Sequence, residues 1–372
     1  MPDTPTSPAT MSNLARSILR KNLRVRPGEN VTIEAWTHTL PYAVALAREA
    51  RRLKAHPVIL YEDERSFWDS VAAGESELLG ANPDHEWACL AKTDVFIHMW
   101  GPGDRVRLNA LPAKHDVAFA WFTKWYATAR RTGLRGARLG VGRPFPSFAT
   151  AYAVDQQHWT DRMVAATMVD PAKMARRAMP LARMLERGRR LRITHENGTD
   201  LTLGLAKRRA YTYVGRPVVG DPKQPFEMLC NLPAGSVRVA LDERVAEGTL
   251  VGNRTSFYDD GITGMTTQPT FEFAGGRLTS ARFATGQEAF DHRYAEGGIA
   301  RDRPGFFSVG LNPEVHNTPK AEDVEAGAVL LGLGGNRQLG GRNPGPYFRL
   351  ANWAVLADAR VEVDGKPLPP VT

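Results

Sequence analysis

The residues that could bind a metal ion or move a proton are scattered along this chain. Its nine histidines are His38, His56, His85, His98, His115, His158, His195, His292 and His316. None of them forms the H-x-H or H-x-x-x-H spacing that places two imidazoles on one metal ion. Asp291 is adjacent to His292, but adjacent residues on a helix do not share a face. The histidines alone therefore predict no metal centre.

The segment NPEVHN, residues 312–317, carries a carboxylate and an imidazole close together. It follows a predicted strand, so Glu314 and His316 can lie at the border of a cleft. An imidazole in this place can act as a general base near neutral pH. The alternative is a loop histidine that makes a structural hydrogen bond, and the sequence leaves both open.

The segment GGNRQLGGRNPGPY, residues 334–347, is rich in glycine and holds Arg337, Arg342 and Tyr347. A guanidinium offers paired donors to a carboxylate or to a peptide backbone. These side chains are therefore candidates for binding a ligand, and a solvated loop is the alternative.

The first half of the chain has the pattern of an α/β domain. Residues 29–36 alternate like a strand, residues 40–55 place apolar residues at helical spacing, and residues 56–62 indicate a short buried strand. This order predicts a β-α-β unit with parallel strands. Residues 93–100 and 138–145 are predicted to be further strands.

Residues 156–190 are predicted to be helical, with one apolar and one basic face. The apolar face consists of Met174, Ala178, Leu181 and Leu185. Pro180 is expected to kink or break this helix. The basic face consists of Arg176, Arg177, Arg183, Arg187, Arg189 and Arg190. It is either solvated or a docking surface for an acidic partner.

Strands predominate after Arg190. The turn Asn197-Gly198 separates two alternating segments and is typical of a β-hairpin, while residues 285–297 indicate a helix. We therefore expect an α/β N-terminal domain with a mainly parallel sheet and a β-rich α+β C-terminal domain. The expected division is a disordered tail at 1–11, the first domain at 12–190 and the second at 191–372.

Composition narrows the classes of partner. The net charge of +8 favours an acidic partner, yet no basic stretch matches a nucleic-acid motif, so we expect no nucleic acid. No apolar run is long enough to span a membrane, and the start lacks the pattern of a secretory signal. The cysteines, Cys89 and Cys230, exclude a disulfide framework and are expected to be buried thiols of a cytoplasmic protein.

Several stretches occur in an order and spacing that resemble a known family. They are NGTDLTL from residue 197, NLPAGSVRVALDERVAEGTL at 231–250, FEFAGGRLTSARFATGQEA at 271–289, GFFSVGLNPEVHN at 305–317, VEAGAVLLGLGGN at 324–336 and RVEVDGKPL at 360–368. Together with VRPGENVTIEA at 25–35, they make the chain similar to the thermophilic metallo-aminopeptidases of the aminopeptidase T type. The resemblance covers nearly the whole chain and implies the two-domain fold of that family.

The resemblance also implies where a metal centre would lie. The peptidases, and the similar pyridine-ring dioxygenases, hold metal in the second domain. The peptidases use two glutamates, two histidines and an aspartate around two metal ions. The matching positions here are Ser236, Phe306, Leu330, Phe348 and Leu350. Hydrocarbon cannot replace the water shell of a divalent ion, so we expect no metal and no other cofactor.

Three hypotheses about function follow, and the first is our choice. In the first, the chain is a pseudo-peptidase that binds a peptide, such as an acidic leader or precursor peptide in peptide natural-product biosynthesis. In the second, it is a metal-independent enzyme acting on a small aromatic or peptide-derived substrate. In the third, it is a metal-dependent aminopeptidase or ring-cleaving dioxygenase with a relocated site.

The expected binding cleft is made of the five matching positions and three neighbouring side chains. The neighbouring side chains are His316, Arg342 and Tyr347. The resemblance further implies a homodimer, and we expect no membrane partner.

Overall fold

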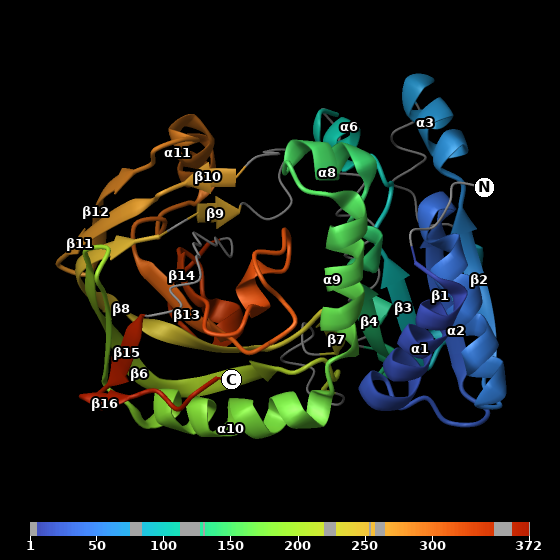
Figure 1. Ribbon diagram of the computed structural model, residues 1–372, viewed down its shortest axis with the longest axis horizontal. Helices are drawn as coiled ribbons and strands as arrows, with labels where there is room; N and C mark the ends of the chain where they lie inside the picture. Colours follow the sequence, from blue (N-terminus) through green and yellow to red (C-terminus); the bar gives the residue numbers. More distant parts are fainter. Residues whose placement is uncertain are drawn as a thin grey trace. The chain divides into compact units, whose positions relative to one another are not determined.

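The chain forms two compact units (Figure 1). The computed structural model describes residues 6–74, 84–111, 127–128, 131–218, 228–252, 254–256, 265–345 and 359–371. Unit 1 comprises Met1–Pro171 and Gly215–Ala234, and unit 2 comprises Ala172–Val214 and Gly235–Thr372. Each unit is therefore built from two separate segments of the sequence, whereas we expected a single boundary at residue 190.

Unit 1 is built on a five-stranded sheet with the order β2-β1-β3-β4-β7. The strands are β1 (Asn30–Trp36), β2 (His56–Glu62), β3 (Val95–Met99), β4 (Arg135–Leu139) and β7 (Leu229–Leu232). Every neighbouring pair in it is parallel, which confirms the predicted parallel sheet. β7 comes from the second half of the sequence, and its pairing with β4 explains why residues 215–234 belong to unit 1.

Two details of the predicted strands are wrong. β2 lies at the edge of the sheet rather than buried within it, and Val58 on this strand is 43% exposed. The strand expected at 138–145 begins earlier and ends at Leu139, because a 3-10 turn at Gly140–Gly142 packs closely on neighbouring residues.

Seven helices of unit 1 lie within the described residues. They are α1 (Pro8–Ser17), α2 (Leu40–Arg52), α3 (Glu64–Ala72), α5 (Asp84–Ala91), α6 (Arg105–Asn109), α8 (Pro146–Ala151) and α9 (Gln156–Met168). The tail expected at 1–11 is too long, because Thr6 is buried and bonds to Tyr42, and Ser7 caps α1. A side-chain oxygen that accepts a hydrogen bond from a backbone N–H of the first turn stabilises the start of a helix at that residue.

The predicted helix at 156–190 is two helices, α9 and α10 (Pro171–Arg187). The break falls before Pro171, where Val169 adopts an extended conformation, because proline disfavours helical geometry in the chain that precedes it. Pro180 lies inside α10, so the helix does not end there. The predicted apolar face is confirmed, since Met174, Ala178, Leu181 and Leu185 are all buried.

α10 belongs to unit 2 because its contacts are there. Glu186 accepts a hydrogen bond from the backbone of Ala210 on β6, at 2.9 Å. Gly188, just after the helix, leaves no room for a side chain against Val363 and Leu205. These contacts anchor the helix to the strands that follow it.

Unit 2 is built on a nine-stranded sheet in which every described pair of neighbours is antiparallel. Seven strands follow the order β12-β11-β8-β6-β5-β15-β16, and β13 pairs with both β8 and β14. The strands are β5 (Arg190–His195), β6 (Thr199–Tyr213), β8 (Ser236–Val251), β11 (Thr270–Ala274), β12 (Arg277–Arg282), β13 (Pro304–Gly310), β14 (Val329–Leu333), β15 (Arg360–Val363) and β16 (Lys366–Pro367). The described part of unit 2 also holds a ribbon of β9 (Arg254–Ser256) and β10 (Met265–Thr267), and the predicted helix as α11 (Gln287–Glu296).

The long strand β8 organises this sheet (Figure 1). Its first half pairs with β13 and its second half with β11, while β6 follows its other edge. The predicted hairpin is confirmed, because Asn197-Gly198 joins β5 to β6 and Gly198 has a positive φ of 96°. Such a φ favours glycine, which has no Cβ to clash.

Both cysteines are free thiols. Cys230 is buried, and burial raises the pKa of its thiol to about 12, so it is unreactive near neutral pH. Cys89 is only half-buried, which departs from the expectation. No helix in the described part of the chain combines the length and apolar character needed to cross a membrane.

The exposed proline inside α10 generates a first prediction. Pro180→Ala restores a backbone N–H and removes a ring from the helix interior, so it should raise the free energy of unfolding by about 1–3 kcal/mol. Urea denaturation followed by circular dichroism measures this change. Met179→Ala, at the neighbouring exposed position, is the control and should change stability by about 0.5 kcal/mol or less. A loss of stability in Pro180→Ala would contradict the prediction.

Candidate functional site

One face of the unit 2 sheet carries the positions at which the resemblance places metal ligands. Residues two apart on a strand share a face, so Ser236, Arg238 and Ala240 of β8 point the same way. On β13, Phe306 lies opposite Ala240, and Ser308 lies opposite Arg238. The pairing of strands thus brings Ser236 and Phe306 to one face, although they are 70 positions apart.

The next strand and the loop after it extend this face. Leu330 of β14 lies opposite Ser308, and Gly332 lies opposite Phe306. Phe306 and Leu330 belong to one core cluster, and they are 0% and 2% exposed. The other members of the cluster are Tyr211, Ala240 and Leu339, with Tyr213 packed against it. Two of the predicted site residues are therefore brought together, but as a closed hydrophobic cluster.

The phenyl ring of Phe306 depends on the absence of a side chain at Gly332. A Cβ built on Gly332 would overlap the ring. Protein interiors are densely packed, so a ring and a methyl group cannot occupy the same space without a costly shift. The ring of Phe306 can therefore fill this position only because Gly332, opposite it, has no side chain.

Polar side chains lie on the same face beside the cluster. Ser236 and Ser308 are buried, and their hydroxyl oxygens have no hydrogen-bond partner among the described residues. Arg238 lies directly opposite Ser308 and two residues from Ser236. It bonds to Asp323 at 2.6 Å and places its guanidinium 5.0 Å from the ring centre of Tyr213. A buried hydroxyl without a partner costs free energy, which makes this row a candidate for a ligand or an ordered water.

The motif-based prediction missed Arg238, Ser308 and Tyr213. The signal was present as alternation, because Ser236-x-Arg238-x-Ala240 and Phe306-x-Ser308 repeat every second residue. Only the register of β8 against β13 shows that these alternating sets meet on one face.

The remaining predicted site residues are not brought to this cluster. The side chain of His316 is 60% exposed, and its Nδ1 lies 4.0 Å from Oε1 of Glu325. Arg342 is exposed at its side chain, and only its backbone N–H makes a described contact, with Glu243. Tyr347, Phe348 and Leu350 lie outside the described residues.

The side chains at the matching positions do not fit a divalent metal ion. Phe306 and Leu330 offer no donor atom, and Ser236 offers only a neutral hydroxyl, whereas such ions require carboxylate, imidazole or thiolate ligands. Within the described ranges, no group of three or more His, Cys, Asp or Glu side chains is placed to hold a metal ion. The described part of this face therefore provides hydrocarbon and hydroxyls in place of a metal-binding donor set.

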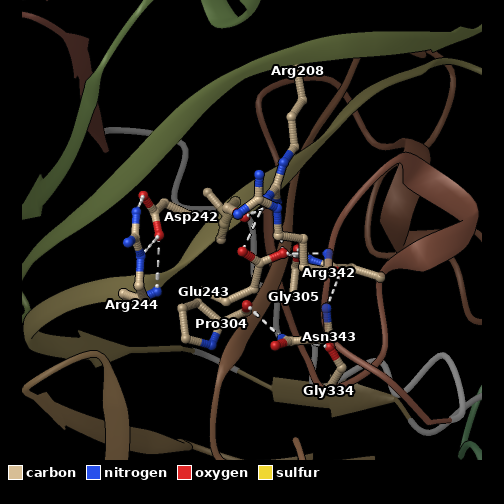
Figure 2. Close-up of polar contacts among 11 residues, drawn as sticks. Arg208, Asp242, Glu243, Arg244, Pro304, Gly305, Gly334, Arg342 and Asn343 are labelled. Carbon is tan, nitrogen blue, oxygen red and sulfur yellow. Dashed lines mark hydrogen bonds and ion pairs between the residues drawn. The ribbon is translucent and has the colours of Figure 1, made fainter.

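A buried carboxylate, that of Glu243, anchors the loop that follows β14 (Figure 2). Glu243 receives two hydrogen bonds from Arg208, at 2.7 and 2.9 Å, and one from the backbone of Arg342 at 2.6 Å. Asn336 donates to the same carboxylate at 3.1 Å and to the carbonyl of Gly305 at 2.9 Å. The loop is thereby tied to β8 and to the start of β13.

A second asparagine completes this anchor. Asn343 donates from its backbone to Asn336 at 2.9 Å, and from its side chain to the carbonyls of Pro304 and Gly334 (Figure 2). Leu339 lies between these two asparagines in the sequence and packs into the hydrophobic cluster. The hydrogen bonds of the two asparagines therefore hold Leu339 in the hydrophobic cluster.

The charge of Glu243 is strongly stabilised. Burial opposes its charged form, but the bonds from Arg208, Arg342 and Asn336 outweigh burial and lower its pKa to about 2. The neighbouring Asp242 pairs instead with Arg244, separately from this network (Figure 2). Glu243 is thus a structural anion, and its partners are held by the protein itself.

Comparisons with known structures define the class of fold. The chain resembles wild-type AmpT from Thermus thermophilus with a TM-score of 0.72 at 16% identity, covering 98% of both chains. It also resembles 2,5-dihydroxypyridine dioxygenase from Pseudomonas putida KT2440 with a TM-score of 0.59 at 17% identity, covering 97% of this chain and 96% of that one. At such identities the likeness shows the fold, and the predicted fold class is confirmed.

The sequence comparison then gives the family. The sequence model of the thermophilic metalloprotease (M29) family matches residues 8–297, and the chain belongs to this family. The match ends before Phe306, so Ser236 is the one matching position that it includes. The comparison with curated proteins found no match. The resemblance predicted from the sequence is confirmed.

The Glu243 network generates a second prediction. Glu243→Gln leaves the half-buried Arg208 without its counter-charge, so it should lower the free energy of unfolding at pH 7 by about 3 kcal/mol. Asp242→Asn is the matched control, because it breaks a more exposed pair, and should cost about 1 kcal/mol or less. Urea denaturation of the three proteins measures both changes.

The same pair has a defined pH dependence. The folded pKa of Glu243, about 2, lies below the value of about 4.3 for an unfolded chain, so its charge adds stability above about pH 4.3. This contribution is lost as the pH falls toward 2. The stability difference between the wild type and Glu243→Gln should therefore shrink across this range. A difference that stays constant would contradict the assigned pKa.

The packing of Phe306 generates a third prediction. Gly332→Ala should lower the free energy of unfolding by about 1–3 kcal/mol, because the new methyl group overlaps the ring. In a Phe306→Leu background the same substitution should cost less, since the ring is gone. A double-mutant cycle by urea denaturation measures this coupling. Equal penalties in both backgrounds would show that the ring is not responsible.

Proposed function

We propose that this chain is a pseudo-peptidase of the M29 family, which keeps the fold and binds a peptide without a metal centre. The observation that carries the proposal is the burial of Phe306 and Leu330 in one hydrophobic cluster, at positions where the resemblance places metal ligands. A hydrated ion does not enter such a cluster, because nothing there replaces its water shell. In this proposal the chain is a non-catalytic accessory protein.

The proposed ligand is an acidic peptide. α10 presents a row of cations along its exposed face, and Arg176, Arg183 and Arg187 recur there at spacings of seven and four, which keeps them on one side of a helix. No described residue forms an ion pair with them. Met179 lies among them and is a large exposed apolar side chain. A peptide with carboxylates and an apolar residue complements such a face.

In this proposal the protein guides a peptide to the enzymes that modify it. A leader or precursor peptide in peptide natural-product biosynthesis has to be held for the enzymes that modify it, and an acidic leader matches the net charge of +8. A homodimer and a cytoplasmic location are further parts of the proposal.

A second candidate function is metal-independent catalysis on a small aromatic or peptide-derived substrate. The observation that favours it is the pair of buried hydroxyls, Ser236 and Ser308, beside Arg238 and the Tyr213 ring. These side chains replace His316 and Arg342 as polar candidates, because the latter two side chains are exposed.

Peptide binding tests the proposal. A fluorescent peptide of about twelve residues, rich in Glu and Asp, should bind the purified protein saturably, and its Gln and Asn counterpart should bind much more weakly. The double substitution Arg176→Glu and Arg183→Glu should weaken binding at least about tenfold, because each reversal replaces attraction by repulsion. Fluorescence anisotropy at low and at moderate salt gives these affinities.

Arg51→Glu is the control, since it makes the same kind of charge reversal at one position on the exposed side of α2 in unit 1. It should leave the affinity within about twofold. The proposal is wrong if the wild type binds neither peptide, or if Arg51→Glu weakens binding as much as the α10 variant does.

A further inference from the structure

The carboxyl edge of the unit 1 sheet has the topology of a ligand-binding edge. In the order β2-β1-β3-β4-β7, the chain moves from β1 outward to β2 and then to the opposite side of β1 for β3. The direction of strand addition reverses between β1 and β3. In parallel sheets of this kind, ligands bind beyond the carboxyl ends of the strands at such a reversal.

A row of ionisable side chains crosses the sheet near this edge. Glu34 of β1 pairs in register with His98 of β3, and His98 pairs with Arg138 of β4. His98 is 7% exposed and Arg138 is 8% exposed. Strands in the middle of a parallel sheet are normally apolar, because both faces are covered. In this row Nδ1 of His98 lies 3.4 Å from Oε1 of Glu34, and Arg138 extends the row across β4.

Three arginines converge on one indole ring where β3 ends. The guanidinium carbons of Arg105, Arg138 and Arg143 lie 5.5, 4.7 and 4.6 Å from the centre of the Trp100 ring. They come from the start of α6, from β4 and from the segment after β4. Guanidiniums gathered around one ring can offer several cationic donors to the same anion.

The electrostatics of His98 agree with this concentration of positive charge. Burial lowers the pKa of His98, Glu34 raises it, and Arg138 and Arg105 lower it again. Since the pKa of His98 ends below its ordinary value, its imidazole adds no further cation at neutral pH.

Acidic side chains lie on both sides of the reversal. At β2, burial raises the pKa of Glu62, and the charges of Glu86, Glu34 and Asp63 raise it further. Beside the loop after β3, Glu64 accepts a hydrogen bond from the backbone of Asp104 at 3.0 Å. The three guanidiniums gather at Trp100, which favours an anion there rather than beside Glu62.

The loop that carries Trp100 and Arg105 is held closely in place. A Cβ on Gly101 would overlap the Trp36 ring, and a Cβ on Gly103 would overlap the Phe145 ring. Arg105 also donates to the carbonyl of Gly101 at 3.3 Å. Groups that are fixed before binding lose less conformational entropy when a ligand arrives.

We infer that the carboxyl edge of β3 and β4 binds the oxyanion of a small organic molecule, a phosphate or a carboxylate, through Arg105, Arg138 and Arg143 beside Trp100. Each guanidinium has five N–H donors in a plane, so it can bind an oxyanion in addition to its existing partners. Nothing in the peptide-binding proposal uses these residues, and this site lies wholly within unit 1.

Isothermal titration calorimetry with three oxyanions tests the inference. Adenosine monophosphate, inorganic phosphate and citrate are titrated separately into the full-length protein at low salt. At least one should bind saturably, and a preference between phosphates and citrate identifies the source of the oxyanion. Arg143→Gln and Arg105→Gln should each weaken that binding about tenfold or more, because each removes a charged hydrogen-bond donor.

Arg107→Gln is the matched control. Arg107 lies two residues from Arg105 on α6 and stacks on a different indole, that of Trp68, at 4.1 Å. Its substitution should leave the affinity within about twofold. Melting curves confirm that each variant is folded. The inference is overturned if the wild type binds none of the three compounds up to about 10 mM, or if Arg107→Gln loses as much affinity as Arg143→Gln.

Discussion

The burial of the Phe306 ring against Gly332 is the constraint on which the described part of the unit 2 sheet face depends. The ring occupies the space that a side chain at Gly332 would need, and it joins Leu330 in a cluster closed to water. Leu339 covers this cluster because the loop that carries it is anchored to the buried charge of Glu243. A polar network therefore stabilises an apolar cluster.

The fold of this family is kept at low sequence identity. The chain keeps the architecture of AmpT over 98% of both chains at only 16% identity, because alternating apolar residues and strand order suffice to specify the sheets. Phe306 and Leu330 bury apolar surface and need no hydrogen-bond partner, so the sheet accommodates them without a polar network of their own.

Local patterns in the sequence predicted strands and turns well, but they did not predict which residues are buried or which distant residues are in contact. The alternation before Trp36 and the Asn197-Gly198 turn act between near neighbours, and both were predicted correctly. Other features depend on distant partners. The exposure of Val58 follows from the edge position of β2, and the anchor at Glu243 joins segments from 208 to 343. The meeting of Ser308 and Arg238 on one face could be predicted only from the strand register, which no single segment contains.

Metal content tests the central claim most directly. The purified protein is incubated with excess zinc, cobalt, manganese or iron, passed through a desalting column, and analysed by mass spectrometry for bound metal. Because Phe306 and Leu330 fill this position with hydrocarbon, we predict far less than one metal ion per chain and no shift of the melting temperature by added metal. One or two tightly held ions per chain, removed by a chelator with loss of stability, would contradict it.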